Sequence, residues 1–279
     1  MRLSIVIVNW NTTSLLKTLI QSIRSNEPKF DYEIIVVDNA SEDFSEDSFR
    51  AEFPEVKLIA NNQNAGYAKG NNKAFEVATG EYILLLNPDT EVTSGAIQTL
   101  VDFMDTHKNA AAAGAKLVRP NSTTDSSLRS FPYPGAIAWE YIGLSKIFPK
   151  SRLFGRYRMT YFNYDKVIEV DQPMGSCLII SRKALEDIGS FDENFPIFFN
   201  EVDWLYRAKE LGYKIYFTPD ATVIHHGAAS TKQINKRIMK SESHESLIRF
   251  YEKHYKGKIA APIYYMTLVC IYISKLIRG

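Results

Sequence analysis

An uninterrupted apolar run lies near the centre of the N-terminal half of the chain, where residues 81–90 read EYILLLNPDT. The five apolar residues Tyr82–Leu86 are too few for a helix and are typical of a strand buried on both faces, as in a parallel sheet. Pro88 has no N–H to donate to a strand ladder, so we expect the strand to end before it. Asp89 then stands at the carboxyl end of a central strand, the edge where open α/β sheets bind ligands. The alternative is that Asp89 is only a turn or cap residue ahead of a helix at 94–106.

Other apolar runs alternate with amphipathic segments along the chain. The predicted strands are 3–8, 32–37, 56–60, 82–86, 109–118, a strand within 171–181, 213–218 and 221–224. The predicted helices begin at Thr12 or Thr13, after Gly66, at 94, within 136–148, at Arg182 and near Glu201. This alternation implies parallel strands joined by right-handed crossovers. We therefore predict an α/β fold with a mostly parallel central sheet flanked by helices.

Polar residues directly follow the predicted strands of the N-terminal half. They are Asn9, Asp38, Asn64 and Asp89. Because parallel strands end at the same edge of a sheet, we expect these four side chains to form one site of about nucleotide size. The alternative is four independent turn residues, which explains each position but not why acids and amides recur.

The first strand–helix turn limits the kind of nucleotide site. It reads NWNTTS and contains no glycine, which a dinucleotide-binding turn needs, and the chain has no GxxxxGK[ST] phosphate loop. The phosphates must therefore be neutralised in another way. A carboxylate at Asp89 can hold a divalent cation that bridges phosphate oxygens.

Two acidic residues of the C-terminal half begin a predicted helix. Glu201 and Asp203 follow the apolar run 195–199, and acids in a first turn are also favoured by the helix dipole alone. A carboxylate against an apolar wall has a raised pKa, which suits a general base. His225 follows a strand in the sequence HHG, where a structural role and a metal-ligand role are both open.

Two basic segments stand out in a chain whose formal net charge is only +1. In the first, four cations are interleaved with four aromatic residues. The cations are Lys150, Arg152, Arg156 and Arg158, and the aromatic residues are Phe154, Tyr157, Tyr161 and Phe162. Such a segment can bind nucleic acid or lipid headgroups, or it can be a solvated loop.

The second basic segment is the C-terminal tail, 232–279, which carries ten Lys/Arg and three Glu. It contains sixteen uncharged residues at 259–274, fewer than the about 20 apolar residues that a spanning helix needs. Tyr264, Tyr265 and Tyr272 favour a membrane–water boundary. We predict a helical tail that lies on a membrane surface; the alternative is a helix packed on the catalytic domain.

Cysteine content and the N-terminus bear on location. Two cysteines form no disulfide framework, which favours a reducing cytosol. We expect no signal peptide, because the apolar run 5–8 ends at Asn9 without a cleavage site.

Seven segments, in order over roughly residues 1–255, resemble the family 2 glycosyltransferases of the GT-A fold, in particular bacterial rhamnosyltransferase-like members. They read IVIVNWNT, VVDNAS, NAGYAKGNN, LLLNPD, MGSCLIISR, IGSFDENFPIFFNEVDWLYRAKELGY and HHGAAS. The resemblance implies a GT-A catalytic domain over 1–231, with a nucleotide-binding half at 1–115 and an acceptor half at 116–231. The tail, 232–279, follows it.

The resemblance also implies roles for individual residues. Asp38 would contact the nucleobase near Asn9, and Asn64, Gly66 and Asn72 would line the nucleotide and donor sugar. Asp89 would hold Mg²⁺ or Mn²⁺, and His225 would complete the metal or diphosphate site. Glu201 matches the position of the catalytic base, with Asp203 as the fallback, because the family usually has Glu-Asp-x-Asp where this chain has Asn-Glu-Val-Asp.

The implied reaction is inverting sugar transfer from dTDP-rhamnose or a UDP-hexose to a hydroxyl of a growing cell-surface glycan. The acceptor would be linked to polyprenyl diphosphate and reached at the cytosolic membrane face, without a nucleic-acid partner. A nucleotidyltransferase of similar fold is one alternative, although NWNTTS lacks the glycines and cations that a triphosphate needs. A degenerate glycan-binding protein is another, although acids stand at the three expected positions.

Overall fold

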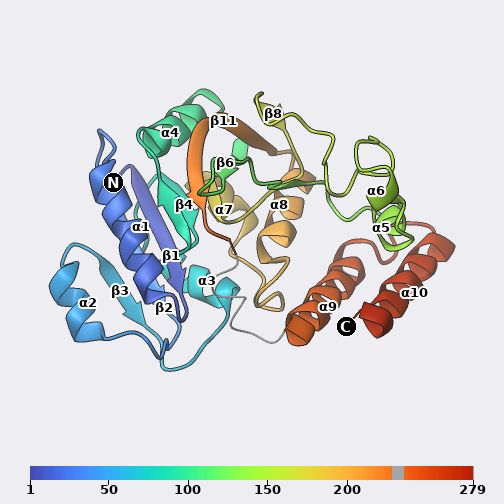
Figure 1. Ribbon diagram of the computed structural model, residues 1–279, viewed down its shortest axis with the longest axis horizontal. Helices are drawn as coiled ribbons and strands as arrows, with labels where there is room; N and C mark the ends of the chain where they lie inside the picture. Colours follow the sequence, from blue (N-terminus) through green and yellow to red (C-terminus); the bar gives the residue numbers. More distant parts are fainter. Residues whose placement is uncertain (228–235, 279) are drawn as a thin grey trace.

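A single large sheet with helices on both faces forms the body of the computed structural model, which describes residues 1–227 and 236–278 (Figure 1). The strands of this sheet are β1 (Leu3–Asn9), β2 (Tyr32–Asp38), β3 (Lys57–Ala60), β4 (Tyr82–Leu86), β5 (Thr90–Val92), β6 (Ala110–Val118), β8 (Ile168–Glu169), β10 (Cys177–Ser181) and β11 (Lys214–His225). Their order is β3-β2-β1-β4-β10-β6-β11-β5, with β8 paired to β11. A separate pair joins β7 (Leu128–Arg129) to β9 (Gln172–Pro173).

Ten helices surround the sheet in the described residues. They are α1 (Thr13–Ser25), α2 (Glu46–Glu52), α3 (Tyr67–Val77), α4 (Ala96–Thr106), α5 (Pro134–Tyr141), α6 (Leu144–Ile147), α7 (Arg182–Ile188), α8 (Asn200–Glu210), α9 (Lys236–His254) and α10 (Ala261–Arg278). The predicted α/β fold with a mostly parallel central sheet is confirmed. The helix α2 and the strands β5, β7 and β8 were not predicted.

Strand direction changes in the middle of the sheet. The strands β3, β2, β1 and β4 are parallel, as the alternation predicted, and β6 is parallel to β11. Between these groups β10 is antiparallel to both β4 and β6. The chain enters β10 at Cys177 beside Leu86, that is, from the carboxyl end of β4, because it arrives from a loop at that edge and not through a crossover helix.

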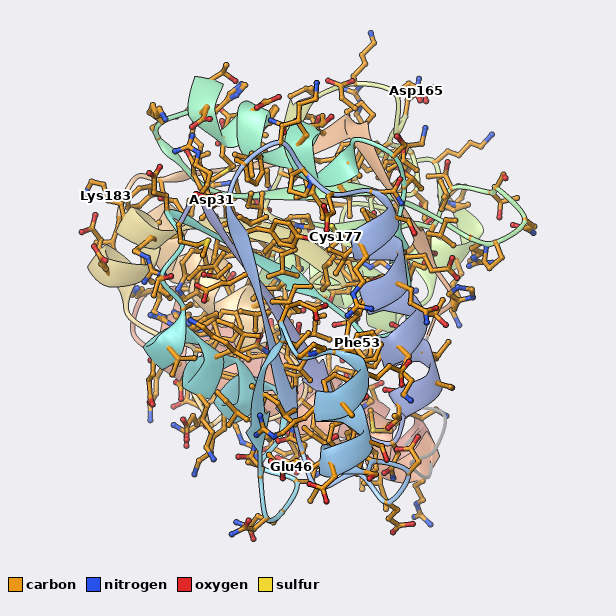
Figure 2. The ribbon with its side chains drawn as sticks, turned by 90° about the vertical axis from the view of Figure 1, so that its left-hand side faces the viewer. Asp31, Glu46, Phe53, Asp165, Cys177 and Lys183 are labelled. Atoms are coloured by element: carbon orange, nitrogen blue, oxygen red, sulfur yellow. The ribbon has the colours of Figure 1, made fainter. Side chains whose placement is uncertain are left out.

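Alternate residues of each strand face two separate apolar cores. On one face Ile5 and Ile7 pack beneath α1, α2 and α4, and Arg24 of α1 lies 4.6 Å from the ring of Phe53, which follows α2. Phe53 is labelled in Figure 2, which views the molecule from the end that carries α1 and α2. On the other face Val6 and Val8 pack with α3, α7 and α8. Both faces of the central strands are thus buried, as their unbroken apolar runs require.

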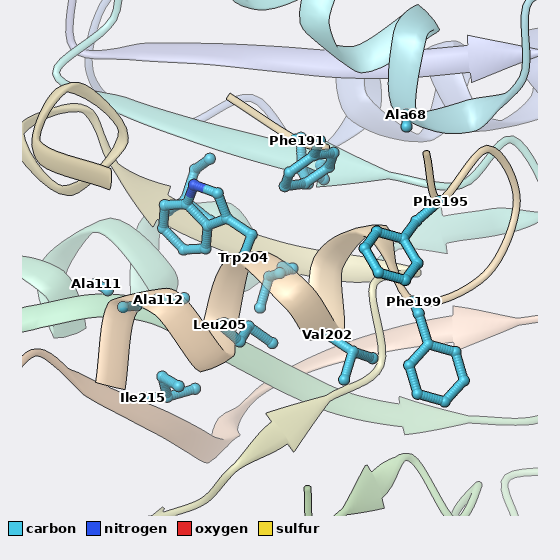
Figure 3. Close-up of a cluster of buried hydrophobic side chains, with 14 of the residues drawn as sticks. Ala68, Ala111, Ala112, Phe191, Phe195, Phe199, Val202, Trp204, Leu205 and Ile215 are labelled. Atoms are coloured by element: carbon cyan, nitrogen blue, oxygen red, sulfur yellow. The ribbon is translucent and has the colours of Figure 1, made fainter. Parts of the chain in front are cut away.

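The second core fixes helix α8. Its side chains Val202, Trp204 and Leu205 point at the sheet, and Figure 3 shows them with Ala111 and Ala112 of β6 and Ile215 of β11. Small alanines on β6 let the indole of Trp204 approach the sheet and become fully buried. The start of α8 is therefore held rigidly next to the carboxyl edge of β4.

Two predicted boundaries differ from the observed ones. The helix predicted within 136–148 is broken into α5 and α6 because Gly143 between them adopts φ +88°. The strands predicted at 213–218 and 221–224 are one strand, β11, with a register shift between Thr218 and Thr222. The strand β6 runs across the predicted division at 115/116, and the predicted division at 231/232 lies outside the described residues.

The C-terminal helices form the end of the molecule opposite α1 and α2 (Figure 1). Helix α10 packs against α9 and α5, and it buries Tyr264, Thr267, Ile271 and Ser274. One face of the tail thus packs on the rest of the chain, as the alternative interpretation predicted. Among the described residues, no helix combines the length and the apolar character needed to cross a membrane.

Candidate functional site

A cavity of about 770 Å³ opens at the carboxyl ends of β1 and β4, where the sequence places its polar cluster. Its lining residues are Val8, Trp10, Asn39, Asn64, Ala65, Gly66, Tyr67, Asn87, Pro88, Asp89, Met174, Gly175, Ser176, Pro196, Ile197, Phe198, Glu201 and His225. The size falls within the range of about 300–1,000 Å³ typical of small-molecule sites. Of the residues named from the sequence, five line it: Asn64, Gly66, Asp89, Glu201 and His225.

Asp89 and His225 meet on one wall of the cavity. The antiparallel pairing of β5 with β11 places His225 opposite Thr90 and brings its Nε2 atom 3.7 Å from Asp89 Oδ1. Both side chains are buried, and Ser176 Oγ lies 3.3 Å from the same ring nitrogen. The other ring nitrogen, Nδ1, lies 3.2 Å from Asp125 Oδ2, which orients the imidazole.

This pair fits a divalent cation that is shared with a phosphate ligand. A histidine that binds a metal commonly has a carboxylate on its other ring nitrogen, as Asp125 is placed here. Throughout the described part of the chain, no three His, Cys, Asp or Glu side chains are grouped to hold a metal ion. Asp89 and His225 thus offer a partial coordination shell, and Mg²⁺ and Mn²⁺ are ions that take remaining ligands from phosphates and water.

Glu201 lies across the cavity in the first turn of α8. Phe199 precedes the helix with φ +68°, and the Asn200 side chain donates to the carbonyl oxygen of Ile197 (3.0 Å) and accepts from the backbone N–H of Glu201 (2.8 Å). Burial raises the pKa of the Glu201 carboxyl. The apolar run at 195–199 predicted this shift, which suits a group that accepts a proton near neutral pH.

The side chain of Glu201 lies against a glycine. A Cβ atom on Gly175 would lie 3.4 Å from Glu201 Cγ, so the carboxylate rests directly on the backbone of the loop before β10. The carboxylate is thus fixed from two sides, by the helix start and by this loop. Its remaining open side is the cavity.

Asp203 lies away from the cavity. Its carboxylate is fully buried, with Oδ1 2.7 Å from both Lys253 Nζ and His254 Nε2, and Oδ2 2.9 Å from Arg207 Nε. Burial alone would raise the pKa of Asp203, but the bonds from His254 and Lys253 and the charge of Arg207 hold it below the ordinary value. These three partners occupy the carboxylate, so in this structure Asp203 links α8 to α9.

Asn9 and Asp38 lie next to the cavity, and their side chains do not line it. Both are buried, and Asn9 Nδ2 donates to Asp38 Oδ1 over 2.8 Å, in line with the parallel register that pairs the two residues. Asp38 also accepts from the Ser41 hydroxyl (2.7 Å) and the Ser41 backbone N–H (3.0 Å). Together they hold the turn that presents Trp10 and Asn39 to the cavity.

Asn64 and Gly66 shape the rim of the cavity at the start of α3. Asn64 Oδ1 accepts from the Gly66 backbone N–H over 2.9 Å. Gly66 adopts φ +85°, and a Cβ atom there would lie 2.9 Å from the carbonyl oxygen of Pro196. That oxygen accepts from the backbone N–H of Tyr67 over 2.7 Å. Gly66 therefore allows α3 to close against the loop that leads to Glu201.

Asn72 is placed outside the cavity. Its Nδ2 donates to the carbonyl oxygen of Phe191 (2.9 Å), and its Oδ1 accepts from the Phe191 backbone N–H (3.0 Å). The amide therefore pairs with the backbone at Phe191, and the structure gives it no contact with the lining.

Several lining or supporting residues were not singled out from the sequence. Ser176 hydrogen-bonds to Asn87 as well as His225, and Asn87 stands two residues before Asp89 in a motif that was noted only for its acid. Trp10 directly follows Asn9, so its place at the strand end was a usable signal. No signal in the sequence pointed to Asp125, because it lies 100 residues from His225 in a loop of irregular sequence.

Comparison with known proteins adds three findings. A family model described as glycosyl transferase family 2 matches residues 4–189. The chain is 25% identical over 247 residues to the N-acetylglucosaminyl-diphospho-decaprenol L-rhamnosyltransferase of Mycobacterium tuberculosis, covering 82% of this chain and 78% of that protein. It is 28% identical over 211 residues to the low-salt glycan biosynthesis hexosyltransferase Agl10 of Haloferax volcanii, covering 74% of this chain and 61% of that protein.

A solved structure supports the fold. The mannosyltransferase PcManGT of Pyrobaculum calidifontis, solved in complex with GDP-Man and Mn²⁺, superposes with a TM-score of 0.64 at 16% identity. The match covers 98% of this chain and 70% of that one.

Proposed function

Because the chain belongs to the family 2 glycosyltransferases and has the GT-A fold, we propose that it is an inverting glycosyltransferase that uses Glu201 as general base. The observation that carries this proposal is one cavity with a partly buried carboxylate of raised pKa on one wall and the Asp89–His225 pair on the other. The first suits proton removal from an acceptor, and the second suits a donor diphosphate.

The donor half of the site would be built from Asp89, His225 and the rim around Asn64 and Gly66. A divalent cation held there, Mg²⁺ or Mn²⁺, would offset the charge of the departing nucleoside diphosphate. Mn²⁺ accompanies the donor in the archaeal mannosyltransferase. Asp125 would keep the His225 ring in place, and Asn9 with Asp38 would set the turn that contacts the nucleobase.

In the reaction, Glu201 accepts the proton of an acceptor hydroxyl. The oxygen forms a bond to the anomeric carbon from the face opposite the leaving group, and the bond from that carbon to the phosphate oxygen breaks. The electron pair leaves with the nucleoside diphosphate, so the anomeric configuration inverts. Glu201 is suited to this step because its raised pKa makes it a stronger base than an exposed carboxylate.

We infer the substrates from the name of the mycobacterial relative. Its name gives an L-rhamnosyl donor group and an acceptor linked to decaprenyl diphosphate. We infer a dTDP-rhamnose or UDP-hexose donor and a lipid-linked cell-surface glycan as acceptor. The enzyme would then work at the cytosolic face of the membrane, with its C-terminal tail at the lipid surface.

The test is a donor screen followed by product analysis. Purified protein with Mg²⁺ or Mn²⁺ is titrated with dTDP-rhamnose, UDP-glucose, UDP-galactose and GDP-mannose, and the cognate donor should raise the melting temperature by mass action. Proton NMR of the product should then show the inverted anomeric configuration. A retained configuration would refute the inverting mechanism, and the absence of any shift and any transfer would refute the donor class.

A further inference from the structure

The outer face of α10 is apolar and exposed. Its members are Tyr265, Met266, Val269, Tyr272, Ile273 and Leu276, and their spacing of three, four, seven and eight residues puts them on one side of the helix. Leu276 is 87% exposed and Met266 69%. The buried residues of α10, such as Ile271, lie on the opposite side.

A second exposed apolar group lies in the segment that follows α5, the helix against which α10 packs, although it is more than a hundred residues from α10 in the sequence. It consists of Ile142, Ile147, Phe148 and Leu153, of which Ile147 is 66% exposed. These residues belong to the segment 142–153 around α6, directly after α5, and α5 packs against α10 (Figure 1). Single exposed apolar residues are ordinary, but two groups of this size, carried by α10 and by the segment after its packing partner α5, mark an interaction surface.

The charge on this surface indicates what it binds. Residues 141–164 carry five Lys/Arg and no acid. Lys146, Lys150 and Arg152 are exposed, and none of the three forms a side-chain ion pair with a described residue. Several cations elsewhere on the surface are paired, such as Lys17 with Glu52 and Lys258 with Glu210. Unpaired positive charge next to apolar side chains matches an anionic bilayer and repels a second copy of the same surface.

We propose that the outer face of α10 and the segment 142–153 together form one docking surface for an anionic lipid bilayer. The apolar side chains enter the boundary between headgroups and acyl chains, Tyr265 and Tyr272 lie at the headgroup level, and Lys146, Lys150 and Arg152 contact lipid phosphates. This proposal rests on the proposed function, which gives the enzyme a reason to lie at a membrane. It extends that function because it adds the segment 142–153 of the catalytic domain to the tail as a membrane contact.

The test is flotation of the full-length protein with vesicles of phosphatidylcholine containing phosphatidylglycerol, and with pure phosphatidylcholine. The variant Lys146→Gln/Lys150→Gln/Arg152→Gln should bind the anionic vesicles about 100-fold more weakly, from about fivefold per cation. Met266→Ser/Leu276→Ser should weaken binding to both kinds of vesicle. The matched control is Lys17→Gln/Arg24→Gln/Arg50→Gln, which removes the same charge at the α1–α2 end and should bind like the unmodified protein.

Three results would overturn the proposal. The first is no binding to anionic vesicles, the second is equal weakening of that binding by the control variant, and the third is unchanged binding after the replacement of Lys146, Lys150 and Arg152. A dimer in solution that Leu276→Ser dissociates, without vesicle binding, would assign the surface to a second copy. Transfer to a soluble acceptor tests the proposed function separately, since both docking variants should retain it.

Discussion

His254 Nε2 lies 2.7 Å from Asp203 Oδ1, and this buried contact joins the C-terminal helix α9 to the helix that carries Glu201. The imidazole is enclosed by the rings of Tyr206 and Phe250, at 4.5 Å and 4.6 Å between centroids. Because Asp203 stands two residues after Glu201 in α8, the position of the proposed general base depends on a residue of the C-terminal tail.

Replacing His254 by Ala should lower stability. Asp203 would lose one buried hydrogen-bond partner, at a cost of about 1–3 kcal/mol. Urea unfolding checks this, with Lys256→Ala as control, because Lys256 is exposed in the turn that follows the same helix and should change the unfolding free energy by less than about 0.5 kcal/mol. Equal stability of the two variants would contradict the link.

Glu201→Gln and Asp203→Asn should fail in different ways. Glu201→Gln should keep its melting temperature and donor affinity and lose about 10²–10⁴-fold in kcat. Asp203→Asn should lose stability, because it removes the charge that Arg207, Lys253 and His254 surround. If Asp203→Asn instead stays fully stable and loses kcat as Glu201→Gln should, then Asp203 is the base.

The pH profile of kcat should also identify Glu201 as the general base. A general base works when deprotonated, so kcat should fall as the pH drops through the pKa of Glu201. Burial raises that pKa, and the acidic limb should therefore lie above the ordinary glutamate value of about 4.3. The limb should be absent from the residual activity of Glu201→Gln; an unchanged limb would assign it to another group.

The dependence of transfer on Mn²⁺ should differ between variants of Asp89 and variants of Asp125. Asp89→Ala should abolish metal-dependent transfer and leave the fold intact, because Asp89 sits on the cavity wall outside both cores. Asp125→Asn should keep some transfer but need about 10–100-fold more Mn²⁺, because it disturbs only the orientation of His225. Transfer by Asp89→Ala at limiting Mn²⁺, at the rate of the unmodified protein, would show that the metal lies elsewhere.

Glu33 should stabilise the fold in a defined pH range. Burial alone would raise its pKa, but Lys57, Ser4 and Thr79 lower it to about 2. Since the folded pKa is below the unfolded value of about 4.3, this stabilisation is present above pH about 4.3 and disappears as the pH falls towards about 2. The difference in unfolding free energy between the unmodified protein and Glu33→Gln, measured against pH, should shrink over that interval; a constant difference would contradict it.

The parts of the fold that the sequence predicts are those set by local patterns. The apolar run Tyr82–Leu86 is enough to place β4, and its end at Pro88 is enough to place Asp89 beside the cavity. The apolar residues ahead of Glu201 likewise predicted its raised pKa.

The parts that escape the sequence depend on contacts between distant segments. The direction of β10 is one, because a run of five apolar residues has the same pattern whichever way it is inserted. The burial of Asp203 is another, since its partner His254 is 51 residues away in the sequence. Asn72 lies in a motif with Gly66, yet its partner Phe191 is 119 residues away.

The insertion of β10 has a consequence for synthesis on the ribosome. The strands β1 to β4 are made first, but the open edge of β4 and the edge of β6 can pair with their neighbour only after Ser181 has left the exit tunnel. Until then the growing chain exposes one apolar edge of β4 and both edges of β6, which are sites of mispairing between chains. The step that closes the sheet therefore comes late and joins distant segments, which makes it slow. We expect nascent chains that end before β10 to be bound by chaperones and those that extend past β11 to be released.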